Sequence, residues 1–204
     1  MRTKASETPA RRRILDTASA LFYAEGVRTV GIDRIIAEAG VAKATFYHHF
    51  PAKDQLVRAY LEAEFERQRN AVEAVRAAAA DARTALFDIF GFLGENGAGA
   101  GFRGCPFTNA AAEYPDPAHP VRRTISDYRR WNHGLFHDTL TAVGDPTPQG
   151  TATMLMMLRD GVVVGSDLDD PNTVRPVIDD ALTRILGQAP SVTGRGGPAD
   201  EPAR

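Results

Sequence analysis

The sequence is poor in cysteine and has no long hydrophobic run. Its 204 residues include a single cysteine, Cys105, which excludes an internal disulfide framework and a cysteine-based zinc finger. No apolar segment reaches the roughly 18 residues that a membrane-spanning helix needs. The first nine residues are polar and lack the hydrophobic core of a secretion signal. We therefore expect a cytoplasmic protein with no membrane partner.

The alternating pattern of a half-buried strand is also missing, and apolar residues instead recur at helical spacing. This pattern predicts an all-α fold. We expect a helix-turn-helix domain with a flexible arm at 1–52, a second helical domain at 53–187 and a disordered tail at 188–204. The expected helices cover about 9–24, 32–39, 42–49, 53–79, 107–114, 121–143, 151–166 and 172–186, with one more that Asp81 caps and a glycine-rich loop over 94–104.

Sequence motifs of common enzyme classes are absent as well. The chain has no glycine-rich phosphate-binding motif, no nucleophile elbow and no His-Glu-x-x-His sequence. His133 and His137 have the spacing of zinc ligands on a helix, with Glu113 and His119 as conceivable further ligands. Two histidines on a solvated helix face are the simpler interpretation. We therefore expect no catalytic residue, no metal and no cofactor.

Positive charge is concentrated near the N-terminus, although the net charge of the chain is −2. Residues 1–60 contain ten Lys and Arg against six Asp and Glu, whereas the rest of the chain contains 14 against 20. A basic segment on an acidic body is typical of a protein that binds a polyanion at one end. Ordinary variation of surface charge explains the same counts, so charge alone does not identify the partner.

Two very short helices joined by a glycine-containing turn are expected at 32–39 and 42–49, which is the arrangement of a helix-turn-helix. Isolated helices of this length are marginal in water, so they need the apolar stripe of the preceding helix as a third wall. Phe46 and Phe50 can face that wall. The side chains left outside are suited to phosphate oxygens, base edges and thymine methyls; they are Lys43, Thr45, Tyr47 and His48.

This block resembles the N-terminal domain of the TetR family of bacterial transcriptional repressors. The resemblance covers about residues 10–60 and includes the run from 29 to 56, TVGIDRIIAEAGVAKATFYHHFPAKDQL. The matching elements are Ala20-Leu21-Phe22, Gly26, Thr29-Val30, Ile35, Ala39-Gly40-Val41, Thr45-Phe46-Tyr47, His49-Phe50, Lys53 and Leu56. One departure is Ala42, which stands where the family often has Ser, so the second short helix lacks a side-chain N-cap.

The resemblance implies which residues contact DNA. Thr45, Tyr47 and Lys53 occupy positions that commonly contact phosphates or bases, and Lys53 also opens a helix whose backbone N–H groups could share a phosphate. Arg28 and Thr29 are backbone-contact candidates. Positions where sequence readout varies between members are Lys43, Ala44 and His48.

The C-terminal half of this family is implied to hold a dimer contact and an effector pocket. An amphipathic stripe over 174–186 and an almost wholly apolar segment over 154–165 exceed what one small subunit can cover, which indicates an interface. A purely intramolecular core is the alternative. The candidate interface residues are Met154, Leu158, Gly161, Val162, Gly165, Val174, Ile178, Ala181, Leu182 and Ile185.

The pocket candidates are aromatic side chains and a few polar groups, the usual lining of a small-molecule site. Plain core packing is the alternative for each of them. They are Phe87, Phe90, Phe107, Asn109, Glu113, Tyr128, Trp131, Phe136 and Met157. Segment 103–113 is similar to one in a TetR subgroup, in some members of which the matching cysteine senses electrophiles or oxidants. That similarity implies a redox-sensing role for Cys105, against an inert structural one.

Together these features predict a homodimeric, ligand-responsive transcriptional repressor that binds a near-palindromic DNA operator, with its second copy and an unknown small-molecule effector as partners. Activation instead of repression stays open. The alternatives are a small-molecule- or thiol-sensing helical protein that acts through protein partners, and a metal-dependent enzyme.

Overall fold

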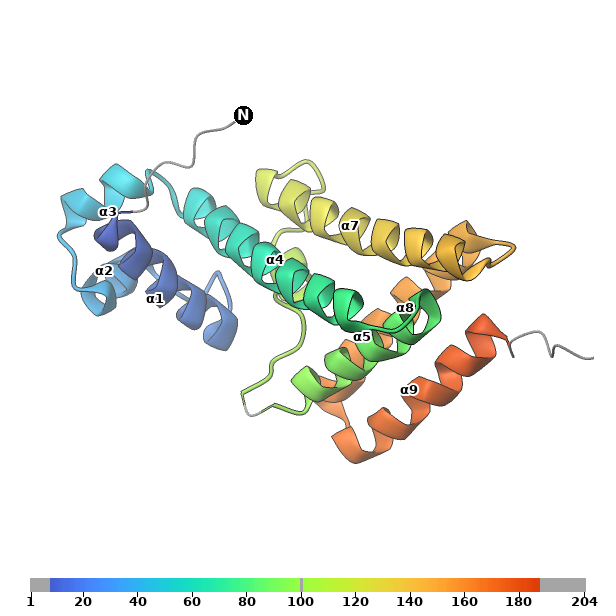
Figure 1. Ribbon diagram of the computed structural model, residues 1–204. Helices are drawn as coiled ribbons and strands as arrows, with labels where there is room; N and C mark the ends of the chain where they lie inside the picture. The colour runs from blue at the N-terminus through green and yellow to red at the C-terminus, as the bar shows by residue number, and fades with distance from the viewer. Residues whose placement is uncertain (1–7, 100, 188–204) are drawn as a thin grey trace, which may run out of the picture.

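The computed structural model describes residues 8–99 and 101–187 and confirms the all-α fold, with no strand in those residues (Figure 1). None of the described helices is long and apolar enough to cross a lipid bilayer. In chain order the helices are α1 (Pro9–Glu25), α2 (Ile32–Ala39), α3 (Lys43–His49), α4 (Lys53–Ala78), α5 (Ala82–Gly97), α6 (Pro106–Glu113), α7 (Pro120–Val143), α8 (Pro148–Leu168) and α9 (Pro171–Leu186).

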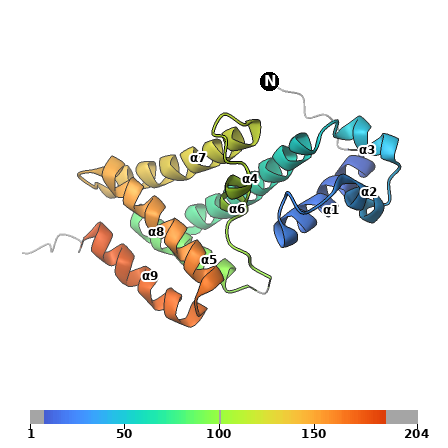
Figure 2. The same ribbon diagram turned by 180° about the vertical axis from the view of Figure 1, so that it is seen from behind.

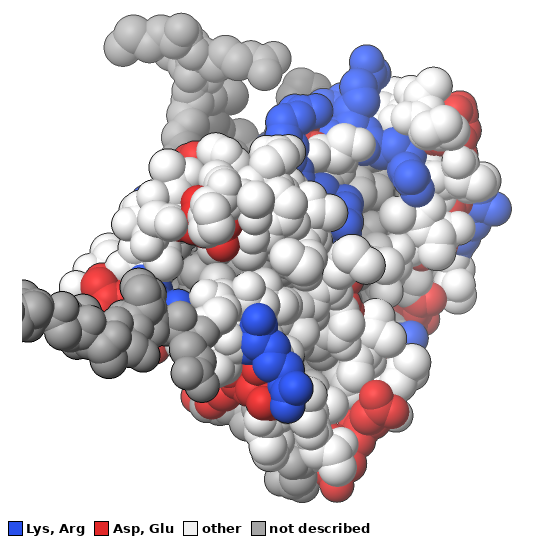
Figure 3. Space-filling view, turned by 90° about the vertical axis from the view of Figure 1, so that its right-hand side faces the viewer, with Lys and Arg blue, Asp and Glu red and all other residues white. Residues whose placement is uncertain are grey.

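The first three helices form a small head at one end of the molecule, which we call the head (residues 8–50) (Figure 1). The long helix α4 runs from the head into a body made of α5, α7, α8 and α9. The view from behind places the short helix α6 beside α4, between the head and the body (Figure 2). At the end opposite the head, small groups of basic and acidic side chains are scattered over a mainly uncharged surface (Figure 3).

The head has the predicted helix-turn-helix geometry. Helix α2 ends at Gly40, whose φ of 61° and ψ of 44° give the left-handed conformation that glycine adopts without a steric penalty. Helix α3 follows Ala42, which makes no side-chain capping hydrogen bond, as expected from its methyl side chain. Phe46 is fully buried and Phe50 nearly so, and both belong to the hydrophobic cluster that includes Ile14 and Ala18 of α1.

The glycine-rich segment is more helical than its composition predicts. Helix α5 continues to Gly97, so the expected loop over 94–104 is wrong for its first four residues. A Cβ atom on Gly97 would lie 2.4 Å from Cβ of Ser166, a distance that real Cβ atoms essentially never show. Gly97 therefore lets α5 approach α8 closely. Packing between these helices outweighs the cost of about 1 kcal/mol for a glycine inside a helix.

The core residues do not separate at the predicted boundary between 52 and 53. One hydrophobic cluster joins head residues to Phe107 of α6 and to Ile125 and Tyr128 of α7. The second cluster lies in the body, around Phe90, Phe136 and Leu155. Because the first cluster spans both sides of the boundary, a movement of α6 or α7 would change the packing of the head residues in that cluster. The described part of the expected body ends at Gly187, and the tail over 188–204 lies outside the described residues.

Candidate DNA-binding surface and effector cavity

The outer face of α3 presents the polar side chains that the sequence predicts. Lys43, Ala44, Tyr47 and His48 are exposed and Thr45 is half-buried. Arg28 and Thr29 are exposed in the turn that precedes α2. Helix α3 has two turns and its buried side is taken by Phe46, so these residues form a narrow polar ridge of the kind that fits a major groove.

The lysines at and beside this ridge, Lys43 and Lys53, form no strong ion pair among the described residues. Lys43 Nζ lies 3.4 Å from Asp33 Oδ1, and both side chains are largely exposed, so this ion pair contributes little stability. Lys53 is half-buried at the start of α4. Burial lowers the pKa of Lys53, while Glu113 and Asp54 oppose that shift. A phosphate at this helix N-terminus would favour the charged form of Lys53 further.

Glu113, at the end of α6, joins the body to the head. Its carboxylate accepts hydrogen bonds from the backbone N–H groups of Val27 at 2.8 Å and Arg28 at 2.5 Å. Gly26 ends α1 with a φ of 89° and a ψ of 155°, and a Cβ there would lie 3.2 Å from Glu113 Oε1. The head therefore occupies the carboxylate of Glu113, which the sequence offers as a candidate for the effector pocket.

Replacing Glu113 with Gln should lower the free energy of unfolding by about 1–3 kcal/mol, because one of the two charge-assisted hydrogen bonds is lost. Urea denaturation measures this change, and amide exchange at Val27 and Arg28 should become faster. The matched control is Glu38→Gln, whose carboxylate pairs with Arg34 on the surface and should cost about 0.5 kcal/mol or less. Equal effects of the two substitutions would contradict the joining role of Glu113.

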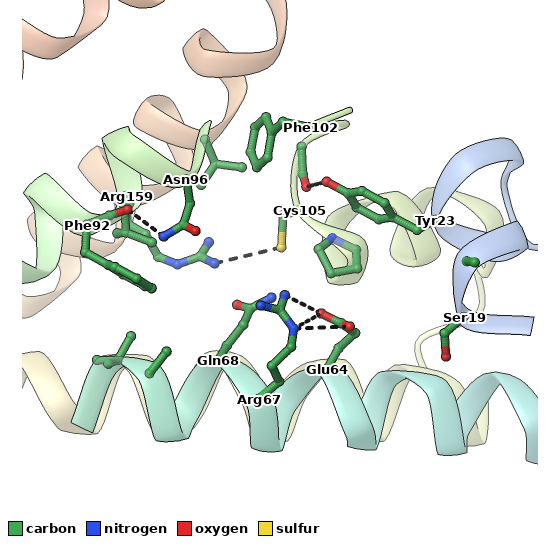
Figure 4. Close-up of a pocket in the computed structure, with 17 residues that line it drawn as sticks. Ser19, Tyr23, Glu64, Arg67, Gln68, Phe92, Asn96, Phe102, Cys105 and Arg159 are labelled. Atoms are coloured by element: carbon green, nitrogen blue, oxygen red, sulfur yellow. Dashed lines mark hydrogen bonds and ion pairs between the residues drawn. The ribbon is translucent and has the colours of Figure 1, made fainter. Parts of the chain in front are cut away.

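A cavity of about 370 Å³ lies where α1, α4, α5, α6 and α8 meet (Figure 4). Glu64, Arg67 and Gln68 project into it from α4, and Arg159 and Cys105 point toward one another across it. The charged residues of its lining are Glu64, Arg67 and Arg159. The rest of the lining is mostly apolar and is formed by Ala20, Ala71, Val72, Phe92, Leu93, Phe102, Pro106 and Val163, with Ser19, Tyr23, Asn96 and Gly104 between them.

Arg159 is the most buried charged side chain at this cavity, with 3% of the residue exposed. Its guanidinium donates to Asp160 Oδ1 at 2.8 Å, to the hydroxyl of Tyr128, and to Cys105 Sγ at 3.8 Å. Burial opposes the charge, but Tyr128, Cys105 and Asp160 raise the pKa of Arg159 overall, so it is cationic. Burial also raises the pKa of Tyr128 to about 12, which keeps its hydroxyl neutral.

The nine residues expected to line the pocket do not line this cavity. Phe90, Phe107, Tyr128 and Phe136 are buried in the core, where flat rings pack against one another, as in the Phe107–Tyr128 stack with 3.6 Å between centroids. Asn109 donates to the backbone oxygen of Arg103. The remaining candidates pack against a core cluster (Phe87, Trp131), bond to the head (Glu113) or are exposed on α8 (Met157).

Cys105 is the one sequence-predicted functional residue of the body that does line the cavity. Its neighbours Arg67, Gln68 and Arg159 were missed, because two of them belong to the polar face of a long helix and resemble ordinary solvated residues. The available signal was Arg159 itself, a cation followed by Asp160 inside the almost wholly apolar segment over 154–165. A charge in such a segment is retained only where it has partners.

Known regulators resemble this chain in sequence and in fold. A family model described as bacterial regulatory proteins of the tetR family matches residues 14–60. The regulator LmrA of Bacillus subtilis is 32% identical over 145 residues, which cover 66% of this chain and 73% of that protein. The crystal structure of SCO4454, a TetR-family regulator from Streptomyces coelicolor, is 41% identical with a TM-score of 0.83, and the match covers 87% of this chain and 94% of that one.

The chain belongs to the TetR family of bacterial transcriptional regulators. It is a DNA-binding regulator, since the matching family consists of bacterial regulatory proteins and its relative LmrA is a helix-turn-helix transcriptional regulator. Some matches are short: YxaF of Bacillus subtilis is 40% identical over 52 residues, which are 25% of this chain and 27% of that protein. A cysteine mutant of CifR, a TetR-family transcriptional regulator complexed with 26-bp double-strand operator DNA, has the same fold with 18% identity and a TM-score of 0.72. The match covers 87% of this chain and 97% of that one.

The candidate dimer-interface residues of this TetR-family chain differ in their burial within the protomer. Val162, Ile178 and Leu182 are at most 4% exposed, because α9 turns its apolar stripe inward onto α5 and α8. Leu158, Gly165, Val174, Ala181 and Ile185 are half-buried. A row of exposed residues instead follows the outer side of α8, and we call it the α8 face: Met154, Met157, Gly161, Val164 and Leu168.

The four residues considered for a zinc site are not brought together. His119 contacts Asp54 at 3.3 Å and accepts from the backbone N–H of Val121 at the start of α7. His133 contacts Thr153, and His137 contacts Asp138. Within residues 8–99 and 101–187 no group of three or more metal-ligating side chains could hold an ion. The arrangement therefore gives no support to a metal-dependent enzyme.

Proposed function

We propose that this TetR-family regulator is a homodimeric repressor that binds a near-palindromic operator and releases it when a small molecule occupies the cavity. The observation that carries the proposal is the position of α6. Cys105 and Pro106 at its first end line the cavity, and Glu113 at its other end holds the backbone of Val27 and Arg28. One short, stiff element thus contacts both the cavity and the turn that leads into the DNA-binding helices.

Each protomer would place α3 in the major groove of one half-site. Lys43, Ala44 and His48 would read bases, because they are exposed on the outer face of α3. The remaining proposed contacts, to phosphates or bases, are made by Arg28, Thr29, Thr45, Tyr47 and Lys53. A two-fold protein reads a two-fold site, so the half-sites would be separated by about one turn of DNA or a multiple of it.

A ligand in the cavity would favour an arrangement of α6 in which the two heads are wrongly spaced for the operator. It needs to discriminate between the two arrangements by only a few kcal/mol to release DNA. This coupling assigns the predicted domains distinct tasks, with DNA binding in 1–52 and effector binding and dimerisation in 53–187. The redox-sensing role of Cys105 stays a prediction, and so does the choice between repression and activation.

The test is selection of random DNA duplexes by the purified protein, followed by a screen for compounds that release the selected duplex. Recovery of a two-fold sequence, protected over both halves in a footprint, is expected. A protected single half-site, or no enriched sequence, would overturn the proposal. An adaptor that binds only protein would show no inverse dependence of DNA binding on salt concentration.

Lys53→Ala should weaken binding to every duplex to the same degree and lower the slope of log affinity against log salt by about 1 per half-site, because one phosphate contact is removed from each. Fluorescence anisotropy at a series of salt concentrations measures both effects. Lys43→Ala is the matched control, since it removes a cation from α3 and should change sequence preference. A changed preference in the Lys53 variant would contradict its phosphate role.

A further inference from the structure

We propose that the cavity binds a small amphipathic organic anion, with an acidic group on Arg159 and an apolar part against Val72, Phe92, Leu93 and Phe102. Only one part of this inference rests on the proposed function, namely that the bound anion is the effector that releases DNA. The binding site itself follows from the burial, partners and charge of the groups around Arg159.

The first argument is the quality of the partners that Arg159 has. The guanidinium donates hydrogen bonds to two oxygen acceptors, on Asp160 and Tyr128. Its remaining acceptor is Cys105 Sγ, a lining atom of the cavity at 3.8 Å. A thiol sulfur is a weak acceptor. A guanidinium that is this deeply buried is stabilised far better by a carboxylate oxygen, which forms short, charge-assisted hydrogen bonds and can bind in a bidentate manner.

The second argument is the balance of charge. Asp160 is shared, because its carboxylate also accepts from Arg129 at 2.8 Å. Glu64 is held by Arg67, with contacts of 3.2 and 2.7 Å. The lining itself therefore contains two guanidinium groups, those of Arg67 and Arg159, and one carboxylate, that of Glu64. An anionic ligand would balance this set, whereas a cationic ligand would increase the excess of positive charge.

The third argument is that Tyr128 does not supply the missing negative charge. Its hydroxyl accepts from Arg159 and donates to Gln68 Oε1 at 2.6 Å, so both of its roles are used and the phenol stays neutral. Gln68 lines the cavity beside Arg67. The hydrogen-bonded row from Gln68 through Tyr128 fixes the Arg159 guanidinium in place, which lowers the entropic cost of binding an acid there.

Size and wall chemistry limit the rest of the ligand. A volume of about 370 Å³ is near the lower end of the roughly 300–1,000 Å³ usual for ligand pockets. Phe92, Leu93, Phe102 and Val72 contribute apolar surface to the lining of the cavity. A single aromatic ring or a short acyl chain that carries one carboxylate matches both the volume and the polarity.

The experiment compares acids with their neutral amides on the full chain. Benzoate, phenylacetate and octanoate are titrated by calorimetry beside benzamide, phenylacetamide and octanamide, and each is then tested for release of the selected duplex. At least one acid should bind tenfold or more tightly than its amide. If no acid of the panel binds, or if the amides bind as well as the acids, the inference is wrong.

Substitutions then locate the acidic group. Arg159→Met should weaken the acid tenfold or more with little effect on the amide, and Arg159→Lys should restore part of the difference. Arg129→Met is the matched control, because Arg129 shares Asp160 but does not line the cavity, and it should change acid binding less than about threefold. Since Arg159 is buried, the acid–amide comparison on the unaltered protein decides the question if Arg159→Met does not fold.

Two further outcomes separate this inference from the proposed function. Acids that bind through Arg159 without releasing DNA would leave the anion site in place and refute its role as the effector site. Neutral compounds that release DNA, with no preference for acids, would support the proposed function and refute the anion site. Cys105→Ser should retain acid binding; loss of acid binding in this variant would show that the thiol, and not the guanidinium, holds the ligand.

Discussion

Gly161→Glu should yield a folded monomer that no longer binds the operator measurably. Gly161 is exposed in the middle of the α8 face, and a Cβ added there would meet nothing within 4 Å in its own protomer. Glutamate is also a better helix former than glycine. The fold of the protomer should therefore survive. We propose the α8 face as the contact between two copies, so the substitution places a charge in the centre of that contact, where it would be desolvated without a partner.

Loss of the dimer should have a large effect on DNA binding. Two linked heads gain an effective concentration at the second half-site that is commonly worth 10²- to 10⁴-fold in affinity. We therefore expect a loss of at least about 100-fold in a gel-shift assay. Sedimentation velocity reports the oligomeric state, and far-ultraviolet circular dichroism shows whether the helices are retained.

Two other substitutions make this result interpretable. Gly161→Ala has a similar gain in helix propensity without the charge, and it should remain a dimer that binds DNA. Ile178→Asp places the charge on α9 at a side chain that is 2% exposed, so this substitution should unfold the protomer. Loss of the dimer in that variant would therefore give no information about the interface. A Gly161→Glu protein that is still a dimer would show that the α8 face is not the contact.

The contrast between Gly161 and Ile178 illustrates what the sequence could predict about α8 and α9. Periodicity identified both helices and the excess of apolar surface correctly, because these depend on local spacing. It could not divide the apolar residues between the protomer's own core and an exposed face. That division depends on the angle at which α9 packs on α5 and α8, which no local pattern specifies.

The cavity shows the same limit more strongly. Aromatic residues were natural pocket candidates by type, yet Phe90 and Phe136 stack in the core, since large flat side chains fill space best when packed on each other. The lining of the cavity combines single residues from several helices, such as Tyr23 of α1 and Arg67 of α4. Their proximity arises from tertiary packing alone. The helix-turn-helix was predictable because its helices, its turn and its outward side chains all lie within one short segment.

Tyr47 and its neighbour Phe46 should give opposite results when each is replaced by alanine. Tyr47 is 40% exposed on the outer face of α3, whereas Phe46 is fully buried beneath it, with 5.3 Å between the two ring centroids. Tyr47→Ala should leave the stability of the head almost unchanged, because alanine favours an exposed helix position. Phe46→Ala should cost about 3–5 kcal/mol through the cavity it leaves.

Tyr47→Ala should weaken DNA binding strongly, because it removes an outward-facing side chain from both recognition helices of the dimer. A good interaction with a base or phosphate is worth about 1–3 kcal/mol, and the dimer makes it twice, so operator affinity should fall by roughly 30-fold or more. Tyr47→Phe separates the hydroxyl from the ring and should have an intermediate effect. Anisotropy titrations measure affinity, and thermal denaturation shows that the Tyr47 variants remain folded. Because α3 is only two turns long, with one side buried, no other face of it could dock in the groove; unchanged binding by Tyr47→Ala would therefore move the DNA contact away from this helix altogether.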